Sequence, residues 1–189
     1  QAATLEAAGA NPIPLQAMLA KVKSGDSDNI EGQAARYYWT RLFGADFRRD
    51  QDAAGINSLL NYGYTIARSA TARAVLAAGL HPSIGLHQSN DGNALRLVDD
   101  LIEPFRPLVD YKVWLLQQKG QTELTPESKR SLVRVLLADL QTDMGATPVM
   151  VCMQRLATSL AQIYCKEKEG LDLPLSALPL DLKQELDQA

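Results

Sequence analysis

The sequence is poor in histidine and cysteine, and this scarcity narrows the chemistry that it can carry. Only two residues of each type occur in 189 positions, and none stands in the Cys/His spacing of a zinc site. Glu-x-x-His pairs, which mark ferritin-like di-iron bundles, are also absent. The chain has neither a Walker A phosphate loop nor a Gly-x-Gly-x-x-Gly dinucleotide fingerprint. Zinc, di-iron and nucleotide sites of these types are therefore excluded.

The two cysteines do not indicate a disulfide. Cys152 and Cys165 fall thirteen residues apart on one predicted helix, which separates them by roughly 20 Å at 1.5 Å per residue and prevents a bond between them. We expect Cys152 to be a small buried apolar residue. No secretory signal pattern occurs, and no apolar run approaches the roughly 20 residues that span a bilayer. We expect a cytoplasmic protein without a membrane partner.

Length and charge leave the choice of partner open. The formal charge is −3 and 46% of the residues are apolar, so a chain of this size suits one domain with a real core. Mild net acidity does not indicate a nucleic-acid binder, but local clustering of charge matters more than the sum. We expect residues 1–189 to form one helical domain, with about 170–189 as a loosely packed tail. Because the sequence begins with Gln, we also expect it to be part of a longer product.

Helical periodicity dominates almost the whole sequence, and the predicted fold class is all-α. The longest segment carries small residues on its apolar stripe, which favours close approach of neighbouring helices and makes it the expected central helix. Gly79 followed by Pro82 predicts its end, and Thr125-Pro126 predicts a helix start. Strand signals are weak and allow at most a short hairpin near 138–146. The expected helices cover residues 14–23, 28–43, 53–78, 93–119 (with kinks near Pro104 and Pro107), 125–137 and a segment that begins at Thr147-Pro148.

Glu31 has two possible roles. Asp28-Asn-Ile-Glu31 is a capping-box pattern, in which the acid bonds back to the start of its helix. The same acid is in phase with the apolar residues Ala34, Tyr38 and Leu42. A carboxylate on a buried face needs a partner, because an unpaired one is costly. Capping and metal ligation both remain open on these residues alone.

A second acidic group follows a loop that contains both histidines. Asp100 and Glu103 share one helical face, where pairing with nearby arginines in solvent is the plain interpretation. His87 lies in a Gly- and Pro-punctuated loop, and a neutral imidazole facing paired carboxylates is a workable shell for a hard divalent cation. His87 could equally be a structural loop residue. His81, in Leu-His-Pro, is expected to be a turn residue.

Four motifs follow one another in a fixed order along the sequence. They are Glu31-Gly-Gln-Ala-Ala-Arg-Tyr-Tyr38, Leu60-Asn-Tyr-Gly-Tyr64, Ala77-Ala-Gly-Leu-His-Pro-Ser-Ile-Gly-Leu-His87 and Asp99-Asp-Leu-Ile-Glu-Pro-Phe-Arg-Pro-Leu-Val-Asp110. Together they resemble one known family, the spacer-acquisition endonuclease/integrase family of the CRISPR adaptation complex. The resemblance is to the helical C-terminal domain of its type II branch and covers nearly the whole chain. Two later segments, 123–130 and 154–162, are also similar to that branch.

The resemblance implies a catalytic divalent-metal site. By this likeness Glu31, His87 and Glu103 bind Mn²⁺ or Mg²⁺, and Asp100 holds a metal-bound water or orients His87. The implied reaction is strand transfer, in which the 3′-hydroxyl of a captured DNA fragment attacks a phosphodiester of the CRISPR repeat. The implied setting is the prokaryotic cytoplasm.

The same resemblance implies DNA contacts and partners. Arg36, Arg41 and Arg106 are the expected phosphate contacts, and Tyr62 is a candidate for positioning DNA. Arg106 could instead be a plain ion-pair partner of Glu103, and Tyr62 could pack in the core. The implied partners are double-stranded DNA (spacer precursor and repeat), a small ferredoxin-like adaptation protein and, in the full-length protein, a second copy.

Two departures from the family pattern qualify these expectations. The loop after His87 is polar and slightly acidic where the branch often has an aromatic or basic residue, which puts loop contacts to DNA in doubt. The β-rich N-terminal domain of the family is absent from this sequence.

Two other function classes stay open, namely a metal-free helical DNA-binding or scaffolding module and a protein-interaction domain. Metal binding separates the integrase from both.

Overall fold

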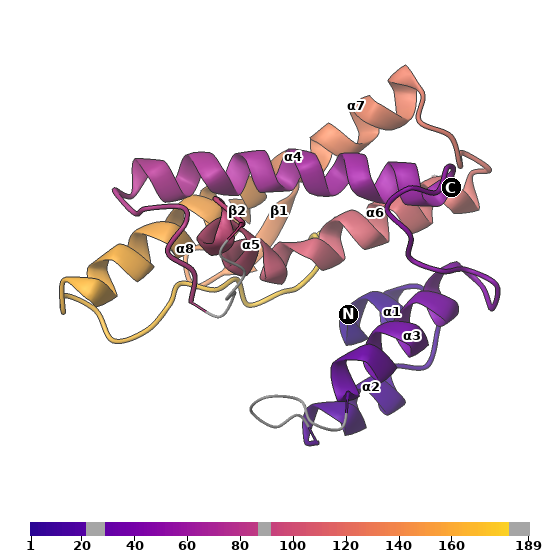
Figure 1. Cartoon of the computed structure of the whole chain (residues 1–189), viewed down its shortest axis with the longest axis horizontal. Helices are drawn as coiled ribbons and strands as arrows, with labels where there is room; N and C mark the ends of the chain where they lie inside the picture. The colour runs from indigo at the N-terminus through magenta and orange to yellow at the C-terminus, as the bar shows by residue number, and fades with distance from the viewer. Residues whose placement is uncertain (22–28, 87–91, 182–189) are drawn as a thin grey trace.

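The computed structural model describes residues 1–21, 29–86 and 92–181, and helices dominate it (Figure 1). The described residues of the N-terminal half contain four helices, of which the last is the longest: α1 (Ala2–Ala7), α2 (Ile13–Leu19), α3 (Ile30–Phe43) and α4 (Ile56–Ala77). The remaining elements are α5 (Arg96–Ile102), the 3₁₀ turn η1 (Glu103–Phe105), α6 (Arg106–Gln118), α7 (Pro126–Arg134), η2 (Val135–Leu137), β1 (Asp139–Thr142), β2 (Gly145–Pro148) and α8 (Val149–Tyr164).

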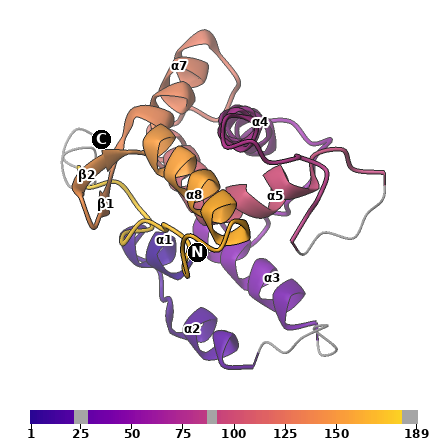
Figure 2. The same ribbon diagram turned by 90° about the vertical axis from the view of Figure 1, so that its left-hand side faces the viewer.

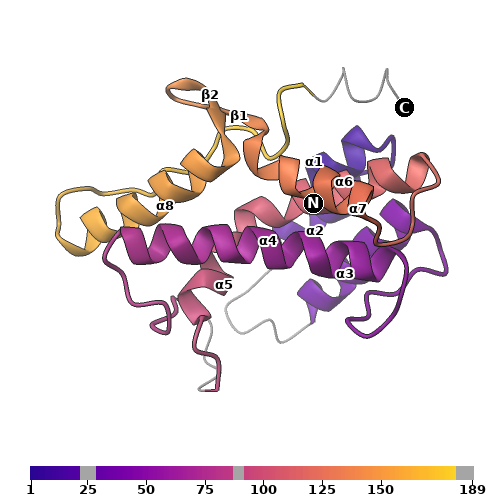
Figure 3. The same cartoon turned by 90° about the horizontal axis from the view of Figure 1, so that it is seen from above.

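Helix α4 is the centre of the fold, as its length and small residues predict. It packs against α5, α6, α7 and α8, and Figure 3 shows α8 and α7 lying along its length. Gly63 explains how α6 approaches so closely, since an added Cβ there would clash with Val109 Cγ1. The chain leaves α4 through Gly79, whose φ of +75° confirms the predicted glycine stop.

Helices α1, α2 and α3 form a group on one side of the molecule (Figures 1 and 2). They contact one another, and α1 also contacts α6. Tyr38 and Leu42 of α3 are buried in the common core. Helix α1 was not expected from the sequence, because its six residues carry no side-chain cap.

The predicted helix over 93–119 is divided by its prolines. Helix α5 ends at Ile102, η1 tightens the chain for three residues, and α6 begins at Arg106. Pro104 and Pro107 stand near the start of η1 and of α6, where their missing N–H groups cost little. The helical backbone is therefore interrupted where Glu103 and Arg106 lie.

The all-α prediction needs one correction, because the chain contains a small antiparallel sheet. Strands β1 and β2 pair from Asp139 opposite Pro148 to Thr142 opposite Gly145. The hairpin is therefore real, and it extends two residues beyond the predicted 138–146. The Thr125 start of α7 is also confirmed, since Thr125 Oγ1 accepts a hydrogen bond from Ser128 N–H at 3.2 Å. Among the described residues, no helix is both long and apolar enough to cross a membrane.

Candidate functional site

The site begins at the junction of α5, η1 and α6, where Glu103 and Arg106 form an ion pair. Arg106 Nε lies 2.7 Å from Glu103 Oε1, and the Glu103 side chain is 58% exposed. The pairing is the i, i+3 contact that the sequence offered as the plain interpretation of Arg106. A carboxylate this exposed remains open to a ligand from solvent.

Asp100 ties the preceding loop to α5. Leu86 N–H donates a hydrogen bond to Asp100 Oδ2 at 2.6 Å. The same loop is held at two further points, since Leu97 N–H donates to Pro82 O at 2.9 Å and Arg96 Nε donates to Ser83 O at 2.8 Å. The chain is thus fixed beside Asp100 at the residue that immediately precedes His87 in the sequence. His87 itself lies outside the described residues.

His81 occupies a local turn, as expected. Its Nδ1 lies 2.8 Å from Ser83 Oγ and 3.4 Å from Ser83 N, and the backbone carbonyl of His81 accepts a hydrogen bond from Ile84 N–H. These contacts stay within three residues of the histidine. They indicate a role in shaping the turn.

Asp99 faces α4 and anchors α5 to it. Arg68 donates to both carboxylate oxygens of Asp99, from Nε at 2.6 Å and from Nη2 at 2.9 Å. Asn93 Nδ2 donates to Oδ2 at 2.7 Å. Burial works to raise the pKa of Asp99, but these hydrogen bonds outweigh it and hold the pKa below its ordinary value. Asp99 therefore orients α5, which carries Asp100 and leads directly into Glu103 of η1.

Negative charge accumulates around Glu103. Burial raises the pKa of Glu103 above its ordinary value, and the nearby carboxylates Asp99 and Asp100 add to this rise. Arg106 opposes it but does not cancel it. Like charges that crowd one carboxylate are relieved by a cation. Among the described side chains, Arg106 supplies part of this relief through its ion pair with Glu103.

A buried carboxyl group lies behind this junction. Asp110 is only 2% exposed. It accepts a hydrogen bond from Tyr38 Oη at 2.8 Å and another from Tyr64 Oη. Burial raises its pKa to about 6, against the effect of the two tyrosine hydrogen bonds. Three helices, α3, α4 and α6, are thereby joined at one point beneath Arg106.

Two arginines lie over the ring of Tyr64. The guanidinium carbon lies 4.9 Å from the ring centroid for Arg106 and 5.6 Å for Arg49, both within the range of a cation–π contact. Arg49 is held in place by Asn57 Oδ1 at 3.0 Å and Asn61 Oδ1 at 2.6 Å. Two fixed positive groups beside one ring suit an anionic ligand.

These groups open into a cleft of about 830 Å³. Its lining includes Glu103, Arg106, Arg49, Tyr64 and a wall formed by residues 173–177. An adjoining cleft of about 570 Å³ adds Arg68 and Asp99, and it shares Arg49, Tyr64 and Arg106. Arg49 and Arg68 were not singled out from the sequence, because their partners come from distant segments. Tyr64 stands in the motif Leu60-Asn-Tyr-Gly-Tyr64, but no role was predicted for it.

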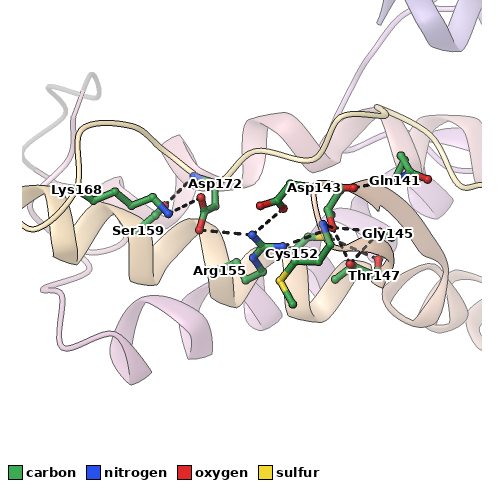
Figure 4. Close-up of polar contacts among 11 residues, drawn as sticks. Gln141, Asp143, Gly145, Thr147, Cys152, Arg155, Ser159, Lys168 and Asp172 are labelled. Atoms are coloured by element: carbon green, nitrogen blue, oxygen red, sulfur yellow. Dashed lines mark hydrogen bonds and ion pairs between the residues drawn. The ribbon is translucent and has the colours of Figure 1, made fainter.

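The wall is a strap of chain, residues 171–181, attached to β1 and α8. Leu175 N–H donates to Gln141 O at 2.7 Å, and Leu180 N–H donates to Asp139 O at 2.9 Å. Asp172 is fixed by Lys168 Nζ at 2.6 Å and by the hydroxyl of Ser159, which accepts from Asp172 N–H at 2.9 Å (Figure 4). Arg155 lies between Asp172 and Asp143 in the same view.

The other predicted site residues stand apart from this junction or outside its contacts. Glu31 is exposed in the first turn of α3, so burial does not force a partner on it, contrary to the sequence-based expectation. Helix α3 starts after Asn29, and the predicted cap Asp28 lies outside the described residues. Within 1–21, 29–86 and 92–181, no three His, Cys, Asp or Glu side chains gather closely enough to hold a metal ion.

The predicted DNA contacts lie on different surfaces. Arg36 is exposed on α3, and Arg41 on the same helix lies over the Tyr37 ring at 5.3 Å. Tyr62 is half-buried and lies under Lys129 of α7 at 5.6 Å. Of these candidates, only Arg106 belongs to the cleft that contains Glu103.

Comparison with known proteins gives one consistent answer. The family model described as "CRISPR associated protein Cas1" matches residues 15–141. A CRISPR-associated endonuclease Cas1 from Neisseria meningitidis serogroup C is 36% identical over 169 residues, which cover 88% of this chain and 55% of that protein. A Cas1 endonuclease from Pyrobaculum aerophilum is 31% identical over 140 residues, 71% of this chain and 47% of that protein.

A solved structure agrees with the sequence matches. A casposase bound to integration product superposes with a TM-score of 0.71 at 25% identity, over 93% of this chain and 59% of the casposase chain. The chain spans about half the length of the curated relatives that it matches. The fold described above is thus shared with a protein whose structure contains the product of an integration reaction.

Proposed function

Because this chain belongs to the CRISPR-associated Cas1 family, we propose that it forms the metal-binding helical part of a DNA endonuclease and integrase. The proposed reaction is the insertion of new spacers into a CRISPR array by strand transfer, as the motifs indicate. The relatives are named endonucleases, and the casposase is named with its integration product. The type II branch is compatible with the Neisseria relative.

The observation that carries the proposal is the tie between Asp100 and Leu86. It holds the start of the His87 loop against the helix turn that bears Glu103. A histidine that follows Leu86 has a short path to that turn. Oxygen donors from Asp100 and Glu103 together with one imidazole fit Mn²⁺ or Mg²⁺.

The residues of the cleft have separable roles in this proposal. Glu103, His87 and Glu31 hold the ion, and Asp100 positions the His87 loop. A divalent ion in such a site polarises the scissile phosphate and stabilises developing negative charge. Arg106, stacked on Tyr64, offers a fixed cation to a neighbouring phosphate.

Glu31 enters the proposal through the family motif alone. It lies on α3, and the contacts described above do not connect it to Glu103. Arg36 and Arg41 stay predicted phosphate contacts on the exposed part of the same helix. Tyr62 stays a predicted DNA-positioning residue. Its ring contacts Lys129 of α7 and so lies on the α7 side of α4.

The proposed partners follow from the same family membership. They are double-stranded DNA, a small ferredoxin-like adaptation protein and a second copy of the full-length protein. The alternative function is a metal-free helical DNA-binding or protein-interaction module. The Glu103–Arg106 ion pair favours this alternative, because each of the two charges already has a partner.

Metal binding decides between the two functions. We expect the chain to bind one Mn²⁺ in a titration followed by electron paramagnetic resonance, and we expect His87→Ala and Glu103→Gln to abolish that binding. His81→Ala is the matched control and should bind Mn²⁺ normally, because His81 contacts only its own turn. In the full-length protein His87→Ala should also abolish strand transfer while DNA affinity stays nearly unchanged. Equal behaviour of the two histidine variants would contradict the proposed roles.

A further inference from the structure

A second basic groove lies between α6 and α7, away from the cleft that contains Glu103. Its volume is about 410 Å³, and its lining includes the cations Lys112, Lys119, Arg130 and Arg134 with one carboxylate, Glu127. The whole chain carries more acids than bases, with a formal charge of −3. Four cations against one acid in one groove therefore reverse the average charge of the molecule.

Helix geometry turns these cations toward a common space. Arg130 and Arg134 are four residues apart on α7. Lys112 lies on α6, and Lys119, seven residues later, directly follows the last residue of that helix, so each pair lies on one side of its helix. Lys119, Arg130 and Arg134 are exposed, and no ion-pair partner occurs for them among the described side chains. Arg130 and Arg134 form a like-charged i, i+4 pair, which destabilises an isolated helix. The helix dipole favours a cation near a helix C-terminus, which explains Lys119 and Arg134 but not Arg130.

The remaining lining indicates which partner fits. Gln121 and Ser131 add polar groups, and such side chains join arginine and lysine in contacts to nucleic-acid phosphates. The apolar floor, Leu115 and Leu116, is buried, and the groove has no aromatic lining residue. Protein interfaces instead concentrate aromatic residues and are depleted in lysine at their centres. The groove thus suits a phosphate backbone better than a protein surface.

The distance along α6 between the candidate site and the groove gives the length of DNA duplex that spans both. Arg106 begins α6 and Lys119 follows its last residue. Thirteen residues at 1.5 Å each place them roughly 20 Å apart along the helix axis. This distance equals about six base pairs at 3.4 Å per step. Figure 1 shows α6 running from the α5 region to the end where it meets α7.

We propose that the α6–α7 groove is a second DNA-backbone site, which holds a duplex about six base pairs from the phosphate at Arg106. The proposal rests on the proposed DNA function and adds a contact surface to it. No sequence is read there, because the contacts go to phosphates. The groove would fix the path and the register of the duplex relative to the cleft.

The test compares two triple variants of the 189-residue chain. Lys119→Gln/Arg130→Gln/Arg134→Gln removes the groove cations. The control, Lys21→Gln/Arg73→Gln/Lys166→Gln, removes three exposed cations from scattered places and changes the net charge equally. Fluorescence anisotropy of a labelled 30-base-pair duplex, measured over a range of NaCl concentrations, gives the affinity and its salt dependence. Thermal melting confirms that both variants fold.

The groove variant should lower the slope of log affinity against log salt by about two to three, since each phosphate contact contributes about 0.9. Its affinity should fall by about tenfold or more, and the control should change neither quantity comparably. Equal slopes for the two triple variants would overturn the proposal. So would a groove variant that loses affinity for a labelled poly-glutamate peptide but keeps its DNA affinity, since the groove would then bind acidic protein. If the triple variant does not fold, Arg134→Glu against Arg73→Glu repeats the comparison.

Failure of this proposal differs from failure of the proposed function. The Mn²⁺ titration varies His87 and Glu103, whereas the groove test varies Lys119, Arg130 and Arg134. An intact groove effect without Mn²⁺ binding leaves a DNA-binding module, and Mn²⁺ binding without a groove effect leaves a metal site with another DNA path.

Discussion

Asp110 is a carboxyl group held by two neutral hydroxyls in the interior. Tyr38 and Tyr64 donate to it, and its side chain is almost completely shielded from water. Ionisation of such a group is costly, and its pKa rises from 3.8 to about 6. Between these pH values the folded protein holds a proton that the unfolded chain releases. Stability from this group is therefore lost as the pH rises through this window.

We predict that Asp110→Asn removes this pH dependence. Two pKa units correspond to about 3 kcal/mol, so the unfolding free energy of the parent should fall by that order between pH 4 and pH 7 relative to the variant. Urea unfolding at both pH values measures the difference. Asp46→Asn, on an exposed loop, is the control and should not change the comparison. A stability difference between the parent and the Asp110→Asn variant that is the same at both pH values would contradict the raised pKa.

At the residue scale, the sequence predicted the roles that depend on near neighbours. The local turn of His81 and the Glu103–Arg106 pair were foreseeable because their partners lie within three residues. Asp110 and Arg49 were not, because their partners Tyr38, Tyr64 and Asn61 come from other segments. For Glu31 the prediction from near neighbours was wrong. Helical phase placed it on an apolar stripe, but it is exposed in the first turn of α3.

Helices α4 and α6 depend on Gly63 for their close approach. A Cβ at this position would meet Val109, a branched and buried side chain with little room to move. We predict that Gly63→Ala destabilises the protein by up to about 2 kcal/mol, because overpacking of about 1–3 kcal/mol outweighs the helix propensity gained, about 1 kcal/mol. Chemical denaturation measures this loss.

Val109→Ala provides the matching test of the cause. In the Gly63→Ala background it should recover part of the lost stability, whereas alone it should destabilise by leaving a cavity. Gly170→Ala is a suitable control, since nothing lies within 4 Å of the added Cβ. A Gly63→Ala protein as stable as the parent would show that the helices approach less closely than described.

At the element scale, the sequence predicted the helices that carry strong stop and start signals. Gly79 and the Thr125 cap placed two boundaries to within a residue. The prolines marked the α5–η1–α6 junction but not the three separate elements, because proline at a helix start permits either a kink or a break. The path of the strap along β1 could not be predicted from the sequence, because it depends on hydrogen bonds between residues some 35 positions apart.

The whole molecule spreads its positive charge over separate surfaces. Arg36 on α3, the Arg49–Arg106 cleft and the α6–α7 groove are separate places, and acids outnumber bases in the chain. We predict that the isolated chain binds duplex DNA weakly, with a Kd of about 10⁻⁴–10⁻⁶ M at physiological salt. A dimer and a ferredoxin-like partner would assemble the positive surface that one copy lacks. Fluorescence anisotropy measures the affinity, and nanomolar binding by the monomeric chain would contradict this expectation.

The strap also sets an order of events during synthesis. Residues 173–177 leave the ribosome after every other named part of the Glu103 cleft. A nascent chain can therefore build α4, α5 and α6 and still lack one wall of the cleft. The cleft becomes complete only when the strap has docked on β1 through Gln141 and Asp139. The cleft is in this way finished only after a stretch of chain well beyond its other walls has been translated.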